Sequence, residues 1–164
     1  MNVMRFVHVP GKIPNISGPY LKKKDYHHLM RVAPVVCVDM VVTDGRKFLL
    51  VKRKNEPKKG QWFLPGGRLV KNESFVEAVK RKLFEETGLR AKKPELIGLA
   101  EHFRVDGYLE DDFAHVITLV FKTTVSINQK IKLDSQSSDA RWFDKIPKNL
   151  YSYPKQSLRL LGFK

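Results

Sequence analysis

The sequence is poor in cysteine, in long apolar runs and in acidic residues. Its one cysteine, Cys37, excludes an internal disulfide and any metal site built from several thiolates. No run approaches the roughly 20 apolar residues of a membrane helix. The N-terminal stretch, which contains Pro10 and Pro14, lacks the continuous apolar segment of a signal peptide. We therefore expect a cytoplasmic protein with no membrane partner.

The shortage of acidic residues gives the chain a strong positive charge. It has 31 Lys and Arg against 17 Asp and Glu, a formal net charge of +14. Such a charge favours anionic partners, such as nucleotides, phosphorylated substrates or nucleic acid, although a lysine-rich surface is also typical of heat-adapted proteins. With 164 residues, 42% of them apolar, the chain is long enough for one folded domain with a short extension.

Turn residues and hydrophobic periodicity divide the chain into an irregular arm over residues 1–20 and one domain over residues 21–164. The apolar run from Val35 is typical of a buried strand, and Asp44-Gly45 predicts a hairpin turn to a second strand. The predicted elements are helices over 21–31, 74–87 and 155–162, and strands over 35–42, 47–53, 96–104, 115–125 and 140–143. This mixture is typical of an α+β fold.

The helix over 74–87 ends with two acidic residues, Glu85 and Glu86. The helix dipole disfavours carboxylates at this end. The pair therefore suggests a bound cation such as Mg²⁺, which takes oxygen ligands and bridges to substrate phosphates. The alternative is that Arg81 and Lys82, one turn earlier, form surface contacts with these acids, each worth only a few tenths of a kcal/mol. Composition alone leaves both interpretations open.

The spacing of residues 67–89 closely resembles the Nudix box. Gly67 is followed after five residues by Glu73 and after seven more by the run RKLFEETGL. Every fixed position of the box matches except Lys82, where the box has a glutamate, and so long a pattern is far more specific than a short glycine motif. The resemblance implies the Nudix fold, a mixed β-sheet between α-helices. It also implies hydrolysis of a nucleoside diphosphate linked to another group, with Mg²⁺, or Mn²⁺ as the alternative ion.

Further stretches between about Leu21 and Phe143 resemble the GDP-mannose mannosyl hydrolase branch of this family. That branch cleaves the sugar carbon–oxygen bond of a nucleotide sugar and releases GDP and the hexose, whereas ordinary Nudix enzymes cleave a P–O bond. It also departs from the common box at the position of Lys82. The matching stretches are Lys24-Asp25-Tyr26, Pro34 with Asp39, Lys52-Arg53, Gln61 to Arg68, His102-Phe103 and Asp134 to Trp142.

The resemblance implies roles for individual residues. Its implied metal ligands are Glu86, Glu85, the Gly66 carbonyl and Gln136, and Arg81 is implied as a catalytic arginine that holds the diphosphate or the nucleotide. Its implied substrate-binding residues are Asp39, Arg53, Arg68, His102 and Asp25. In this branch the histidine crosses into the neighbouring subunit's site, so we expect a homodimer in which His102 and the segment around Asp25 reach the partner's site.

Simpler interpretations exist for several of these residues. Gln136 lies in a polar loop, where a solvated side chain is more common than a ligand. Asp39 would be satisfied at an edge strand that reaches water, because a buried unpaired carboxylate is costly. Arg81 would orient the helix by pairing with Glu73 or Glu77. The two substrate-binding arginines would be ordinary surface residues, and the histidine an ordinary residue at the end of a strand.

Two departures separate the chain from the mannosyl hydrolase branch. Ser137 stands where the branch has its histidine general base, and Val116 stands where it has a tyrosine that contacts the leaving diphosphate. His115, Asp139 and Asp112 are nearby candidates for a replacement base. A positioned base is worth ~10²–10⁴-fold in rate, so the missing histidine predicts slow sugar C–O hydrolysis unless a neighbour substitutes.

Lys82 is a further departure from the common box. On a helical wheel it projects between Glu85 and Glu86. Its ammonium group would there either compete with Mg²⁺ or contact a substrate phosphate.

Three functions follow from these patterns. The leading hypothesis is a Mg²⁺-dependent hydrolase of a nucleotide sugar, with GDP-mannose as the first substrate to test. The second is a pyrophosphatase for ADP-ribose-like substrates, which Glu85-Glu86 and the missing histidine favour. The third is a catalytically weakened nucleotide- or RNA-binding module, suggested by Lys82, Ser137 and the positive charge. Nucleic acid is not the expected partner, because the metal-binding set is nearly intact and no base-stacking signature is present.

Overall fold

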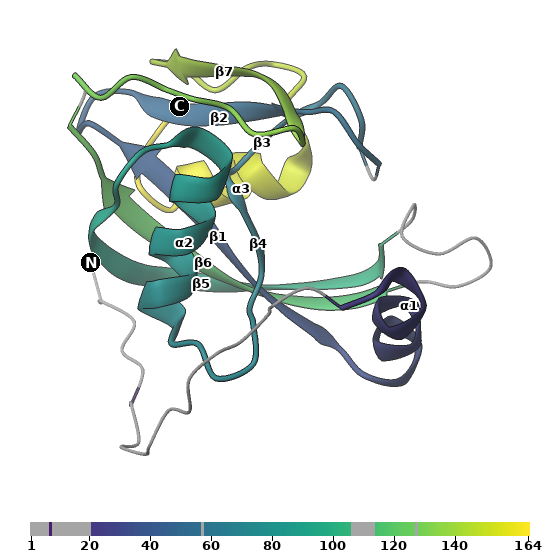
Figure 1. Cartoon of the computed structure of the whole chain (residues 1–164). Coiled ribbons are helices and arrows are strands. Elements are labelled where there is room, and N and C mark those ends of the chain that lie inside the picture. The colour runs from purple at the N-terminus through teal and green to yellow at the C-terminus, as the bar shows by residue number, and fades with distance from the viewer. Residues whose placement is uncertain (1–6, 8–20, 57, 106–113, 127) are drawn as a thin grey trace.

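The computed structural model describes residues 7, 21–56, 58–105, 114–126 and 128–164. All of the predicted N-terminal arm except Val7 lies outside these residues, as does Asp112. The described residues form a mixed seven-stranded sheet with helices on both faces (Figure 1). This arrangement confirms the predicted α+β architecture.

The central strand is β1 (Val35–Thr43), which carries buried residues on both faces of the sheet. It pairs in parallel with β6 (Ala114–Thr124) along its whole length. On the far side of β6 lies the antiparallel strand β5 (Lys92–Val105). A near-continuous apolar run such as that of β1 is expected for a strand covered on both faces.

On the side of β1 away from β6, β1 pairs with two different strands, β2 (Phe48–Arg53) and β4 (Gly66–Arg68). The remaining strands are β3 (Trp62–Phe63) and β7 (Ser137–Phe143). The predicted Asp44-Gly45 turn forms, but β1 and β2 pair next to it, at Thr43 and Phe48. β2 then pairs with β3 and β7, while β4 pairs with β1. The predicted hairpin is therefore short, and the divergence of β2 brings the Gly66-Gly67 turn against the middle of β1.

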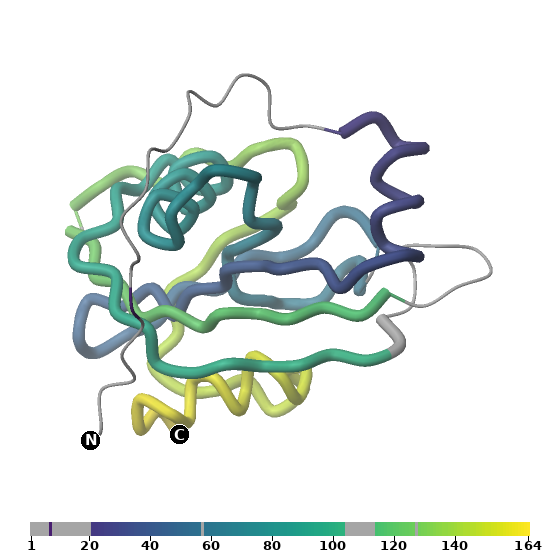
Figure 2. The backbone as a smooth tube through the Cα atoms, turned by 90° about the horizontal axis from the view of Figure 1, so that it is seen from below, coloured from purple at the N-terminus to yellow at the C-terminus, as the bar shows by residue number. Residues whose placement is uncertain are grey.

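Helices cover the sheet from opposite sides. Figure 2 shows α2 (Phe75–Thr87) on one face, α3 (Ser152–Arg159) on the other, and α1 (Lys23–Val32) at one end. Alternate residues of β1 serve the two faces: Val38, Met40 and Val42 join the core beneath α2, and Val41 joins the core beneath α3. No helix in the described part of the chain is long and apolar enough to cross a membrane.

The ends of the helices differ in how well the sequence predicts them. At α2 the predicted capping box forms between Ser74 and Glu77, and Gly88 ends the helix with φ 70°. The helix predicted over 155–162 instead begins at Ser152. Pro154 lies in its first turn, where the N–H that proline lacks would have no helical partner. This earlier start brings Tyr153 into the helix and against the sheet.

Candidate active site

A cavity of about 760 Å³ is lined by residues of all three helices and of strands on both sides of β1. Its volume lies within the roughly 300–1,000 Å³ that is usual for small-molecule sites. The cavity brings together seven of the residues that the sequence predicts for the site, namely Asp39, Arg53, Gly66, Arg68, Glu86, His102 and Gln136.

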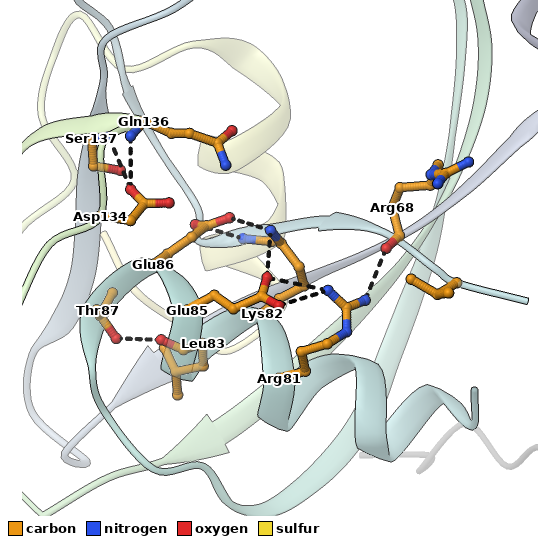
Figure 3. Close-up of polar contacts among 12 residues, drawn as sticks. Arg68, Arg81, Lys82, Leu83, Glu85, Glu86, Thr87, Asp134, Gln136 and Ser137 are labelled. Carbon is orange, nitrogen blue, oxygen red and sulfur yellow. Dashed lines mark hydrogen bonds and ion pairs between the residues drawn. The ribbon is translucent and has the colours of Figure 1, made fainter. Parts of the chain in front are cut away.

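Glu86 lies at the end of α2, where its side chain lines the cavity and is almost completely buried. Burial raises the pKa of its carboxyl group, and the neighbouring Lys82 opposes this shift. The Gly66 N–H donates a hydrogen bond to Glu86 Oε2 over 3.3 Å, and Lys82 Nζ lies 3.3 Å from Glu86 Oε1 (Figure 3). These contacts satisfy a carboxylate that would otherwise be costly to bury.

Gly66 is required by its close approach to β1. It lies opposite Asp39 in the pairing of β4 with β1. A Cβ atom at this position would collide with the Asp39 carboxylate and with the Val38 carbonyl oxygen. The absence of a side chain therefore lets the turn pass directly over the buried acid of β1.

Glu85 occupies a different environment from Glu86 and does not line the cavity. Its carboxylate lies 3.2 Å from Lys82 Nζ and 3.2 Å from Arg81 Nη1. The ion pairs that we considered as an alternative to a metal site are therefore both present, Arg81 with Glu85 and Lys82 with Glu86. They are partly buried contacts rather than surface ones.

Arg81 connects α2 to the loop that precedes it. Its Nε and Nη2 atoms donate to the two carboxylate oxygens of Glu73 at 2.6 and 2.8 Å, and Nη2 also donates to the Arg68 carbonyl at 3.2 Å. Such paired contacts are strong and geometrically specific. Arg81 does not line the cavity, so this geometry favours the predicted orienting role with Glu73 as its partner.

Asp39 is buried in β1 and faces α3. Burial raises its pKa to about 7, although a hydrogen bond from Tyr153 and the nearby positive charges oppose the shift. The Tyr153 hydroxyl donates to Asp39 Oδ2 over 2.9 Å. The edge-strand interpretation of Asp39 is wrong, because β1 lies between β6 and β4 and carries hydrogen bonds on both sides.

The two predicted substrate-binding arginines lie against aromatic rings of the cavity. The Arg53 guanidinium is 5.6 Å from the ring centroid of Phe63, and that of Arg68 is 5.1 Å from the ring centroid of Tyr26. These distances suit cation–π contacts. The rings hold planar cations at the wall of the cavity, where they suit phosphate oxygens.

Ser137, the first residue of β7, and Gln136 directly before it both line the cavity. Their backbone N–H groups both donate to Asp134 Oδ1, at 2.9 and 3.2 Å (Figure 3). Asp134 thereby fixes the turn that presents both side chains.

His102 lies on β5, with its ring centroid 4.5 Å from that of Tyr153 in an edge-on arrangement, and burial lowers its pKa. His102 faces the cavity of its own chain.

Besides Glu85 and Arg81, three further predicted site residues lie outside the cavity. His115 contacts Glu101 at 3.1 Å and stacks on Phe103. Asp139 Oδ2 accepts a hydrogen bond from Arg141 Nε at 2.8 Å. Asp25 is an exposed residue of α1. The two described candidates for a replacement base, His115 and Asp139, are therefore engaged elsewhere, and a role of Asp25 at a partner's site stays a prediction.

Sequence analysis assigned no role to the aromatic residues that line the cavity. These residues are Tyr26, Phe63, Phe103, Tyr151 and Tyr153. Tyr26, Phe63 and Phe103 lie within stretches that resemble the mannosyl hydrolase branch, and that match is the signal that could have identified them. The two tyrosines before Pro154 gave no such signal, because only the fold brings the start of α3 to the cavity.

The groups in the cavity that could bind a hard divalent cation are of three kinds: a carboxylate, a side-chain amide and a backbone carbonyl. Among the described residues, no three His, Cys, Asp or Glu side chains lie close enough together to hold a metal ion. The Glu86 carboxylate, the Gln136 side-chain amide and the backbone of Gly66 do share the cavity, and Mg²⁺ accepts carboxylate, amide and carbonyl oxygens. The chemistry of these three residues is therefore compatible with the predicted ion.

Comparison with known proteins gives the same family as the Nudix box at residues 67–89. A family model described as a NUDIX domain matches residues 33–146. The chain is 36% identical over 142 residues to an ADP-ribose pyrophosphatase of Methanocaldococcus jannaschii, covering 85% of this chain and 80% of that protein. It is 30% identical over 138 residues to the low-salt glycan biosynthesis protein Agl8 of Haloferax volcanii, covering 84% of this chain and 88% of that protein.

Solved structures share the fold. A MutT Nudix hydrolase from Burkholderia pseudomallei superposes with a TM-score of 0.67 at 24% identity, covering 78% of this chain and 98% of that chain. The Nudix domain of Shewanella oneidensis NrtR, in complex with ADP-ribose, gives 0.62 at 24% identity, covering 86% of this chain and 97% of that chain. Because the family model spans most of the chain and two relatives of at least 30% identity extend along it, this protein belongs to the Nudix hydrolase family.

Proposed function

We propose that this Nudix hydrolase binds a nucleoside diphosphate sugar in the cavity and, with Mg²⁺, cleaves the diphosphate bridge. ADP-ribose is the first substrate to test. The cavity supports this proposal because cationic groups that suit phosphates, oxygen donors that suit a metal ion and aromatic rings that suit a base or sugar share one space of about 760 Å³.

The observation that carries the choice of bond is that a serine, Ser137, lines the cavity where the mannosyl hydrolase branch has its histidine base. Attack on the sugar carbon needs a group that aims and deprotonates water, and Ser137 stands at the position of that base. The described candidates to replace it, His115 and Asp139, do not line the cavity. Attack on phosphorus depends less on a base at this position, because positioning of the substrate and stabilisation of its charge dominate such reactions.

Charge stabilisation is well provided for. Arg53, Arg68 and Lys82 all line the cavity, and guanidinium groups bind phosphate oxygens in pairs of hydrogen bonds. Glu86, Gln136 and the Gly66 carbonyl would hold the Mg²⁺ ion. When bound, such an ion neutralises charge on the diphosphate oxygens and lowers the pKa of bound water. Glu85 would join them only by giving up its contacts with Arg81 and Lys82.

A second candidate keeps the GDP-mannose type of reaction, with release of NDP and sugar. Asp39 supports it, because this matched acid is buried and yet lines the cavity, where it suits a sugar hydroxyl or a base amine. The similarity to a glycan biosynthesis protein is in line with a sugar-containing substrate. His102, kept neutral by its lowered pKa, would be the cavity imidazole available for proton transfer.

Product analysis in ¹⁸O-labelled water distinguishes the two candidates. The full-length protein would be incubated with Mg²⁺ and a panel that includes ADP-ribose, GDP-mannose and other nucleoside diphosphate sugars. Cleavage of the bridge gives a nucleoside monophosphate and a sugar phosphate, with ¹⁸O in one phosphate. The mannosyl hydrolase reaction gives NDP and a free sugar that carries ¹⁸O. Sugar labelling throughout the panel would overturn the proposal, and no turnover at all would favour a binding module.

A further inference from the structure

Lys82 is buried between the two acids that end α2. Its side chain is 10% exposed, and Nζ lies 3.2 Å from Glu85 Oε2 and 3.3 Å from Glu86 Oε1. Burial lowers the pKa of this lysine, but the carboxylates of Glu86 and Glu85 outweigh it and the net shift is upward. The residue that replaces a box glutamate therefore places an ammonium group between two carboxylates inside the site. Figure 3 shows it beside both carboxylates.

The turn before α2 accommodates this lysine. Gly67 has φ 152°, a conformation that side chains rarely adopt, and a Cβ atom there would come within 2.7 Å of Lys82 Cε. The lysine stem thus passes over the bare glycine to reach the acids. Lys82 also lines the cavity, so a ligand bound there would lie beside the same side chain that contacts the carboxylates.

Charge counting shows what this lysine does to the carboxylate cluster. Among the residues that the structure describes, the connected ion pairs contain three acids, Glu73, Glu85 and Glu86, and two bases, Arg81 and Lys82, which together carry one formal negative charge. One divalent ion turns this into one positive charge, and a second would add two more at close range. A glutamate at position 82 would instead leave three negative charges and could accept two ions.

We propose that Lys82 takes the place of a second divalent ion: it limits the carboxylate cluster to one ion and supplies the remaining positive charge to the substrate diphosphate. This inference rests on the proposed function, because it assumes the metal site at Glu86. The simpler interpretation is an ion pair that only stabilises α2. That interpretation predicts that replacing Lys82 changes the stability of the fold but neither the number of ions nor the affinity for a diphosphate.

Binding of Mn²⁺ to the full-length protein tests the first half of the proposal. Unbound Mn²⁺ is counted by electron paramagnetic resonance for the wild type, Lys82→Glu, Lys82→Met and Lys80→Met. Lys80 is an exposed residue of the same helix and serves as the control. We expect one ion per chain in the wild type and Lys80→Met, and two in Lys82→Glu. Lys82→Met should bind one ion more tightly, by about tenfold or more, because a nearby cation is removed.

Binding of ADP in metal-free buffer tests the second half. Lys82→Met should weaken ADP binding by about threefold or more, since a charge-assisted contact is lost, and Lys80→Met should not. Two or more Mn²⁺ ions on the wild type, or unchanged Mn²⁺ binding in both Lys82 variants, would overturn the limit of one ion. Equal ADP affinity in Lys82→Met and the wild type would overturn the contact with the diphosphate.

Glu86→Gln separates failure of this inference from failure of the proposed function. If that variant loses Mn²⁺ while the Lys82 variants behave like the wild type, the metal site stands and the role of Lys82 is refuted. If the wild type binds no Mn²⁺ and turns over substrate without divalent ions, the proposed metal site fails and the inference fails with it. Thermal unfolding of each variant verifies that it is folded, and Lys82→Met keeps the test decisive if Lys82→Glu does not fold.

Discussion

The hydroxyl group of Tyr153 donates a hydrogen bond to Asp39 Oδ2 across 2.9 Å and so connects the first turn of α3 to the central strand. Both groups are buried, and each satisfies the other. The contact places α3 against the sheet and keeps the Asp39 side chain beside Gly66, where β4 passes over β1. Two segments that are far apart in the sequence therefore form one wall of the cavity.

Removal of this hydrogen bond should destabilise the fold. In Tyr153→Phe the buried Asp39 carboxyl group loses its partner, which costs about 1–3 kcal/mol. Urea unfolding should show this as a lower midpoint. Tyr151→Phe is the matched control, since Tyr151 is exposed, and its change should stay within about 0.5 kcal/mol. Equal midpoints for the two variants would mean that the contact adds nothing to stability.

The sequence could predict one half of this relationship and not the other. Asp39 was identifiable because an acid inside an apolar strand needs a partner. Tyr153 was not, since the helix was expected to begin after Pro154, although proline is tolerated in a first turn. Likewise, the spacing of the box located Glu86 and Gly66 directly. The sequence did not predict that β1 pairs with β2 only next to the turn and with β4 further along. This pairing is between distant segments, and local turn signals do not predict it.

Glu86 and Glu85 should differ sharply in their effect on activity. Glu86 lines the cavity, whereas Glu85 does not and instead contacts Arg81 and Lys82. Glu86→Gln should lower Mg²⁺-dependent turnover by about 10²-fold or more, the scale on which losing one charge-stabilising group acts. Glu85→Gln should cost about tenfold or less. Steady-state rates over a Mg²⁺ titration measure both, and circular dichroism verifies the fold. Unchanged turnover in Glu86→Gln would refute the site.

The thiol of Cys37 should react slowly although it lines the cavity. Burial raises its pKa to about 12, so the thiol form persists at pH 8 and the reactive thiolate is scarce. We expect reaction with a chromogenic disulfide reagent to be about 10³-fold slower than for an ordinary thiol, and to accelerate as the pH rises. Protein unfolded in guanidinium gives the reference rate. Fast stoichiometric labelling of the folded chain would contradict the raised pKa of this partly buried thiol.

The predicted homodimer has a candidate surface along β5. Leu99 and Phe103 are 62% and 66% exposed on this strand, which also carries His102. Light scattering should give about twice the chain mass of 19.0 kDa, and Leu99→Lys should shift it towards the monomer because a charge would be buried in the contact. Phe84→Lys, an exposed apolar position on α2, is the control. A fully active wild-type monomer would refute the dimer.

The position of Ser137 provides the most direct test of bond choice. Its side chain lines the cavity at the start of β7, where the mannosyl hydrolase branch has its histidine base. Because a positioned base is worth ~10²–10⁴-fold, Ser137→His should raise GDP-mannose hydrolysis by at least about tenfold, with solvent ¹⁸O entering the free sugar. Ser138→His is the matched control, since Ser138 is exposed and contacts the Lys52 carbonyl rather than the cavity, and it should leave the products unchanged. If Ser137→His cleaves the same bond at the same rate as the wild type, this position does not decide the reaction, and bond choice must then depend on how Arg53 and Arg68 hold the diphosphate.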